Sequence, residues 1–300
     1  MVVALESDLR GTAEFSQAPN PACDAITDYE WRSGFMDLLL AGKSAIVTGA
    51  SKGIGFSVAT ALAREGAKIT MVARNGDELE RACAQIRSTG GQALTVTADT
   101  TNEAAISEVL ATTLQESGSV DILVNAAAQA ADATKSAAIN DLRGADLLHE
   151  MDTKVLGYLR CAQAVVPHMA RSGWGRIINV AGLGARSTGS AFNSIRNVSV
   201  AAMTKNLADE LGQSGINVIA VHPGMTVTER TDDLLQRMAV ASGEDVPAVK
   251  ERLDNATSIG RMVTSAEVAD VITFLCSPRS VAITGDSVPV GGGQRGAIYY

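Results

Sequence analysis

Clustered basic residues, long apolar runs and export signals are all scarce in this chain. Its 300 residues include 25 Lys and Arg against 33 Asp and Glu, which gives a formal net charge of -8. Nucleic acid and anionic membranes are held by clustered Lys and Arg, so neither is an expected partner. No apolar run approaches the length of a membrane span, and no basic start leads into an apolar stretch. We therefore expect a cytoplasmic protein.

Cysteine and histidine are also few, which argues against two kinds of site. The four cysteines, Cys23, Cys83, Cys161 and Cys276, are widely scattered, no C-x-x-C occurs, and there are three histidines. A disulfide framework needs paired cysteines, and a zinc site needs closely spaced Cys or His ligands. We expect reduced thiols and no metal.

Short apolar runs alternate with helical stretches along most of the chain. The first run, Ser44 to Thr48, is rich in β-branched residues and ends abruptly in glycines. Six further strands are expected at Lys68 to Ala73, Gln92 to Ala98, Asp121 to Asn125, Gly175 to Val180, Asn217 to His222 and Ser287 to Val290. This alternation predicts an α/β fold, a Rossmann-like doubly wound parallel sheet of about seven strands with helices on both faces. Its ligand cleft is expected at the carboxyl ends of the strands.

The chain divides unevenly into an extension and one domain. Residues 1–37 are polar, carry Pro19 and Pro21 and show no clear period, which predicts a mobile N-terminal extension. Residues 38–300 are expected to form a single nucleotide-binding domain. Within it, residues 229–259 mix small, apolar and acidic side chains and are expected to form a substrate lid.

The strongest motif is a glycine-rich turn between the first strand and the first helix. It reads Thr48-Gly49-Ala50-Ser51-Lys52-Gly53-Ile54-Gly55. Gly49 permits the tight turn, while Gly53 and Gly55 allow the backbone to approach a pyrophosphate. The free N–H groups at the start of the helix face the anion. We expect this turn, including Ser51, Lys52 and Ile54, to bind a dinucleotide.

Together with this turn, several spaced motifs resemble the short-chain dehydrogenase/reductase family over roughly residues 38 to 295. They are Asp99 after the third strand, Asn125 opening Asn-Ala-Ala-Ala, Pro223-Gly224 with Thr228, and the closing Thr284-Gly285 and Gly291-Gly292. The resemblance implies that Asp99 holds the adenine, that Asn125 lies beside the ribose, and that Thr228 and the Val227 backbone hold the nicotinamide carboxamide. It also implies a small-molecule substrate and a dimeric or tetrameric assembly.

Two cations bear on the choice of cofactor. Arg74 ends the second strand, where an NAD-type enzyme would place an acidic residue against the ribose hydroxyls. A guanidinium there can bind a 2′-phosphate, and Lys52 adds a second positive charge. We therefore expect NADP(H) in preference to NAD(H). If both cations only line a solvated rim, NAD(H) remains open.

The catalytic positions depart from the family pattern. No tyrosine lies between Tyr158 and Tyr299, and Asn193 stands where the family has its tyrosine. Asn197 takes the place of the lysine, and Gly182, or alternatively Ala181, takes that of the serine. Lys154 replaces the asparagine of the preceding helix, so Lys154 and Asn197 resemble an amide and an ammonium exchanged between helices. Alternatively, Lys154 reaches solvent.

Two functions follow from this pattern. In the first, the protein is an NADP(H)-dependent oxidoreductase that interconverts an alcohol and a carbonyl, with Lys154 as electrostatic partner or proton shuttle. A carbonyl that becomes an alkoxide needs a donor or a positive charge close to its oxygen. In the second, the protein does not catalyse a redox reaction. It is a nucleotide-binding regulator, or a lyase or cyclase that uses the same cleft.

Overall fold

The computed structural model describes residues 36–128 and 139–298. The residues from Leu38 onward belong to one compact unit. Most of the expected N-terminal extension, residues 1–35, lies outside the described residues, as do 129–138 and 299–300.

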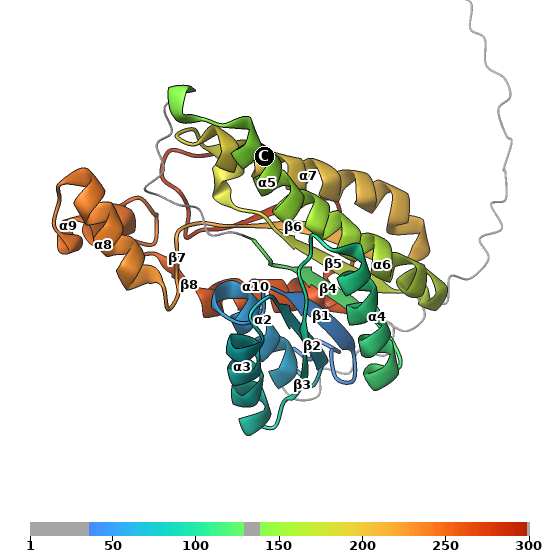
Figure 1. Cartoon of the computed structure of the whole chain (residues 1–300). Coiled ribbons are helices and arrows are strands. Elements are labelled where there is room, and N and C mark those ends of the chain that lie inside the picture. The colour runs from blue at the N-terminus through green and yellow to red at the C-terminus, as the bar shows by residue number, and fades with distance from the viewer. Residues whose placement is uncertain (1–35, 129–138, 299–300) are drawn as a thin grey trace, which may run out of the picture. The chain divides into compact units, whose positions relative to one another are not determined.

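A seven-stranded parallel sheet forms the centre of the unit (Figure 1). Its strands are β1 Ser44–Thr48, β2 Lys68–Ala73, β3 Gln92–Thr97, β4 Ile122–Asn125, β5 Gly175–Val180, β6 Ile216–Pro223 and β9 Ser287–Val290. Their order is β3-β2-β1-β4-β5-β6-β9, so the winding reverses between β1 and β4. Such a reversal opens a crevice at the carboxyl ends of the strands. The predicted Rossmann-like fold is confirmed, and each strand lies within one residue of its expected bounds.

Helices cover both faces of the sheet (Figure 1). They are α2 Gly53–Arg64, α3 Gly76–Ser88, α4 Glu103–Ser117, α5 Gly144–Glu150, α6 Gly157–Ser172, α7 Ala191–Leu211, α8 Thr231–Ser242, α9 Val246–Asn255 and α10 Ser265–Cys276. Apolar side chains of α2, α3 and α10 share one core with the sheet, and those of α4, α6 and α7 share a second. Each face of the sheet is thus sealed by its own hydrophobic core. None of the helices in the described ranges combines the length and apolar character needed to cross a membrane.

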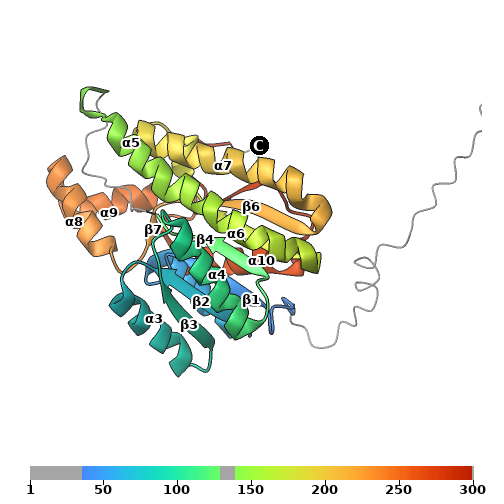
Figure 2. The ribbon, with the colours of Figure 1, turned by 45° about the vertical axis from the view of Figure 1, so that its right-hand side comes forward.

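Helices α8 and α9 stand apart from these layers (Figure 2). They pack on each other through a small core of their own, which includes Leu235, Ala239 and Val249. A two-stranded sheet, β7 Thr226–Val227 with β8 Val263–Thr264, joins this helical pair to the main unit on both sides. The pair falls within residues 229–259, where the sequence predicts a lid.

Candidate functional site

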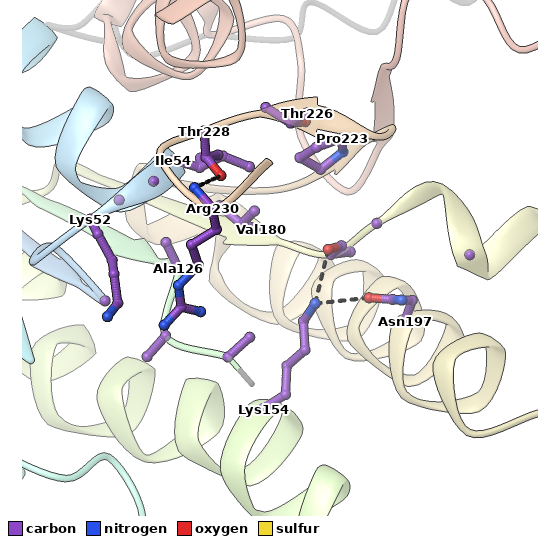
Figure 3. A pocket seen from close by; sticks show the side chains of 18 of the residues that line it. Lys52, Ile54, Ala126, Lys154, Val180, Asn197, Pro223, Thr226, Thr228 and Arg230 are labelled. Carbon is purple, nitrogen blue, oxygen red and sulfur yellow. Dashed lines mark hydrogen bonds between the residues drawn. The ribbon is translucent and has the colours of Figure 1, made fainter. Parts of the chain in front are cut away.

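A cavity of about 1010 Å³ opens at the carboxyl ends of the strands. Its walls come from the glycine turn, from the residues that follow β2, β3, β4, β5 and β6, and from the start of α8. Lys154 and Asn197 reach it from the helical layer, while Thr228 and Arg230 reach it from the opposite side (Figure 3). One space therefore joins the predicted cofactor site to the predicted catalytic residues.

Tight packing of backbone against backbone shapes the glycine turn. Gly49 has φ +68°, and a Cβ added there would lie 2.7 Å from the Ala126 carbonyl oxygen. A Cβ at Gly55 would lie 2.3 Å from the Gly49 carbonyl oxygen. Both positions therefore require glycine. Thr48 Oγ1 accepts hydrogen bonds from the Ala126 and Ala127 N–H groups at 3.1 Å each, which ties the turn to the end of β4.

The start of α2 already binds an anionic group. This helix has no side-chain cap, and the Gly53 N–H donates to a Glu229 carboxylate oxygen at 3.2 Å. Helix N-termini favour negative charge because their first N–H groups lack partners within the helix. The carboxylate stands where a phosphate could bind, so the turn is suited to a dinucleotide.

Most of the residues expected to bind the cofactor line the cavity. They are Gly49, Ser51, Lys52, Gly53, Ile54, Gly55, Arg74, Asp99, Pro223, Gly224 and Thr228. Asn125 is instead buried behind the wall, where its Nδ2 donates to Asn179 Oδ1 at 3.0 Å and to the Tyr158 carbonyl at 3.3 Å. The Val227 side chain is exposed and does not line the cavity.

The two cations expected to select the cofactor lie on the same rim. Lys52 Nζ pairs with Glu78 at 2.9 Å, and Lys52 lowers the pKa of that carboxyl. Arg74 follows β2 and is exposed. The pKa of Asp99 is lowered mainly by the Thr101 N–H and further by the nearby Arg74 charge. Glu78 was not expected here, although an acid in the first turn of α3 is a signal that sequence reasoning could have used.

Lys154 points inward, toward the end of β5. It lies in a π-helical turn, Met151–Leu156, and only 4% of it is exposed. Its Nζ donates to the Ala181 carbonyl and to Asn197 Oδ1, each at 2.9 Å (Figure 3). Burial lowers the pKa of Lys154 to about 7. The structure thus brings Lys154 and Asn197 together and does not place Lys154 in solvent.

Asn193 and Asn197 hydrogen-bond to each other beside Lys154. Asn197 Nδ2 donates to the Asn193 carbonyl at 2.9 Å and to Asn193 Oδ1 at 2.8 Å. A Cβ at Gly182 would lie 3.3 Å from Asn197 Nδ2, and one at Gly184 would lie 2.2 Å from Asn193 Nδ2. Glycines on this loop therefore make room for the amides.

Sequence reasoning missed an ion pair beside this network. Arg196 is 5% exposed, pairs with Glu150 through Nη1, and donates from Nη2 to Asn193 Oδ1 at 3.2 Å. A usable signal was present, because Arg196 shares the buried face of α7 with Val200 and Thr204 at intervals of four residues.

Comparisons with known proteins agree with the geometry. The family model described as enoyl-(acyl carrier protein) reductase matches residues 49–295. Short-chain reductase protein NovJ of Streptomyces niveus is 34% identical over 251 residues, covering 83% of this chain and 93% of that protein.

Solved structures give the same result. L-Sorbose reductase from Gluconobacter frateurii, complexed with NADPH and L-sorbose, has a TM-score of 0.80 and 27% identity, covering 88% of this chain and 100% of that one. A variant actinorhodin polyketide ketoreductase with NADPH has a TM-score of 0.79 and 29% identity, covering 85% of this chain and 98% of that one.

Proposed function

Because the chain belongs to the short-chain dehydrogenase/reductase family, we propose that it is an NADP(H)-dependent oxidoreductase with a non-standard active site. It interconverts an alcohol and a carbonyl in a small or medium-sized substrate. The observation that carries the proposal is the buried Lys154 ammonium, which lines the same cavity as the glycine turn. Positive charge beside a cofactor cleft is what carbonyl reduction requires.

The cofactor would be held by the glycine turn, by Asp99 and by Thr228, with Lys52 and Arg74 at its 2′-phosphate. Glycines that pack against backbone and a helix start that already binds a carboxylate both support this assignment. The two similar solved structures described above also contain NADPH. When bound, a reduced nicotinamide supplies a hydride to the substrate carbon.

The chain's own residues must then manage the charge and the proton on the substrate oxygen. Asn193 lines the cavity, and its Nδ2 is the group that can donate to that oxygen. An amide holds the oxygen but supplies no proton near neutral pH. Lys154, with a pKa of about 7, can release a proton near neutrality and regain it from solvent. Asn193 thus stabilises the developing charge, and Lys154 provides positive charge and the proton.

The first experiment is NADPH binding by fluorescence, followed by oxidation of the bound cofactor with a panel of aldehydes, ketones and diketones. Lys154→Met should lower turnover about a hundredfold or more and leave NADPH affinity nearly unchanged. Lys205→Met is a matched control, because Lys205 is an exposed lysine on α7.

Tight NADPH binding without turnover on any member of the panel would contradict the redox proposal. It would favour the alternative of a nucleotide-binding regulator or a non-redox enzyme. Unchanged turnover in Lys154→Met would remove Lys154 from the mechanism while leaving the redox assignment intact.

The assembly and the lid also remain proposals. Leu148, Leu156, Ile195 and Val198 are exposed apolar side chains on or beside the adjacent helices α5 and α7. Exposed apolar groups on neighbouring elements favour self-association as a dimer or tetramer. We also propose that α8 and α9 close over the substrate, since residues at the start of α8 line the cavity.

A further inference from the structure

Resting on the proposed function, we propose that Arg196, anchored by Glu150, is a positioning residue for the active site. It fixes the Asn193 amide so that its N–H groups face the substrate, and it places a buried positive charge on the hydrogen-bonded network that holds Lys154. Arg196 lines the cavity, but its Nη1 and Nη2 are held by Glu150 and Asn193, so neither Arg196 nor Glu150 is assigned a contact with the substrate oxygen. Their effect would pass through Asn193 and Lys154.

The orientation of the Asn193 amide follows from a chain of obligatory donors. The Lys154 ammonium can only donate, so the atom of Asn197 that it contacts at 2.9 Å must be the oxygen. The other end of the Asn197 amide is then an N–H₂ group, which donates to Asn193 Oδ1 at 2.8 Å. Arg196 can also only donate, and it contacts that same oxygen at 3.2 Å.

Arg196 and Asn197 therefore both donate to Asn193 Oδ1. If the Asn193 amide were flipped, its N–H₂ group would face the N–H groups of both residues. The Asn193 Nδ2 is left to point away from Arg196 and Asn197. Within the part of the chain that the structure describes, this nitrogen has no acceptor, and Asn193 lines the cavity. It is thus a donor held ready for an oxygen in the cleft.

Burial and position suit Arg196 to this task. Its guanidinium bridges Glu150 and Asn193 with different nitrogens, which a planar fork can do and a point charge cannot. Helix α7 supplies Asn193, Arg196 and Asn197, whereas Glu150 ends α5. The ion pair therefore fixes the active-site turn of α7 against α5.

The same ion pair places opposite charges near Lys154. After burial, the positive charge of Arg196 lowers the pKa of Lys154, and the negative charge of Glu150 raises it. On β6, burial lowers the pKa of His222 and the Lys154 charge lowers it further, which favours the neutral form of His222. Asp152, on the same turn as Lys154, pairs with Arg160. Arg196 and Glu150 are thus the charged neighbours that set the proton affinity of Lys154.

The test is a pH titration of Lys154 by NMR in protein labelled with lysine carrying carbon-13 at Cε, together with the pH profile of kcat. Arg196→Met should raise the pKa of Lys154 and Glu150→Gln should lower it, each by about one pH unit. Arg196→Lys should leave the pKa of Lys154 near its wild-type value. It should lower kcat about tenfold, because an ammonium cannot bridge Glu150 and Asn193 as a guanidinium does. Lys205→Met, which removes an exposed ion-paired cation from the same helix, should change neither.

Shifts in the same direction for Arg196→Met and Glu150→Gln, or no shift in either, would overturn the electrostatic role. Full turnover in Arg196→Lys would overturn the positioning of Asn193. If Arg196→Met does not fold, Glu150→Gln and Arg196→Lys still decide both points. Opposite shifts in a protein that reduces no carbonyl would support the role of Arg196 toward Lys154 and contradict the proposed function separately.

Discussion

Lys154 is held by two neutral acceptors, a carbonyl and an amide oxygen, and forms no ion pair with a carboxylate of residues 36–128 or 139–298. An ammonium buried in this way loses hydration that two hydrogen bonds only partly replace. A lysine whose only task was packing would be less costly as methionine. Retaining charge at this cost is what a proton-transferring residue requires.

This cost predicts an unusual dependence of stability on pH. Lys154 has a pKa of about 7 when folded, against 10.5 as the ordinary value. Between these values the unfolded chain binds the proton more tightly, so the free energy of unfolding rises with pH across this window. The contribution of Lys154 should increase by about 2 kcal/mol from pH 7 to pH 9.

Urea unfolding of wild type and of Lys154→Met at both pH values measures this contribution as the difference between the two proteins. Other titrating groups are common to both and cancel. A difference that stays constant with pH would mean that Lys154 titrates at its ordinary value and has no shifted pKa to offer catalysis.

Sequence reasoning could place Lys154 opposite Asn197 because both positions lie on motifs with fixed spacing. It could not find Glu150 beside Arg196, since the two residues are 46 positions apart and come from different helices. Nor could it show that Asn125 is buried behind the cavity wall. Long-range pairing and depth depend on how helices pack, which local patterns do not encode.

Between β7 and α8, the loop places Glu229 on the Gly53 N–H and Arg230 in the cavity. The loop thus contacts the site where the proposed cofactor would bring its pyrophosphate. Two like charges cannot share one helix terminus without repulsion. Binding of the cofactor should therefore require Glu229 to leave, which would couple the cofactor to the start of the proposed α8–α9 lid.

Glu229→Gln should consequently strengthen NADPH binding, by roughly three- to tenfold, because a neutral amide competes less well at the start of α2. Adenosine 2′-phosphate, which has no pyrophosphate, should bind equally to both proteins. Calorimetry with NADPH and with adenosine 2′-phosphate measures the affinity of each protein for each ligand. Asp232→Asn is the control, since Asp232 is an exposed acid in the first turn of α8. An equal gain in that variant would indicate a general charge effect and no specific contact.

The main elements were predictable because their signals are local. Runs such as Ile216–Pro223 are mostly apolar and fully buried, as strands covered on both faces must be. The π-helical turn at Met151–Leu156 carried no such signal. It redirects one turn of helix so that Lys154 faces the end of β5, and it follows from packing in the folded unit.

At the scale of the molecule, the cavity spans the point where the sheet reverses its winding. The glycine turn, Arg74 and Asp99 belong to the β1-β2-β3 half, while the network around Lys154 belongs to the β4-β5-β6 half. A dinucleotide across this point would contact both halves at once. Its binding should therefore stabilise the unit as a whole.

This arrangement predicts a cofactor-dependent shift in thermal stability that reports on Arg74. At a hundred times its dissociation constant, a ligand adds about 2.7 kcal/mol, or roughly 5 to 10 °C in Tm for a unit of this size. NADPH should raise the Tm of wild type more than NADH at equal concentration if, as proposed, Arg74 and Lys52 bind the 2′-phosphate. Arg74→Asp should reverse that order, since a carboxylate repels the phosphate and accepts hydrogen bonds from the ribose hydroxyls. Thermal unfolding with each cofactor in both proteins measures the four shifts, and equal shifts in wild type would refute the assignment of Arg74 to the phosphate.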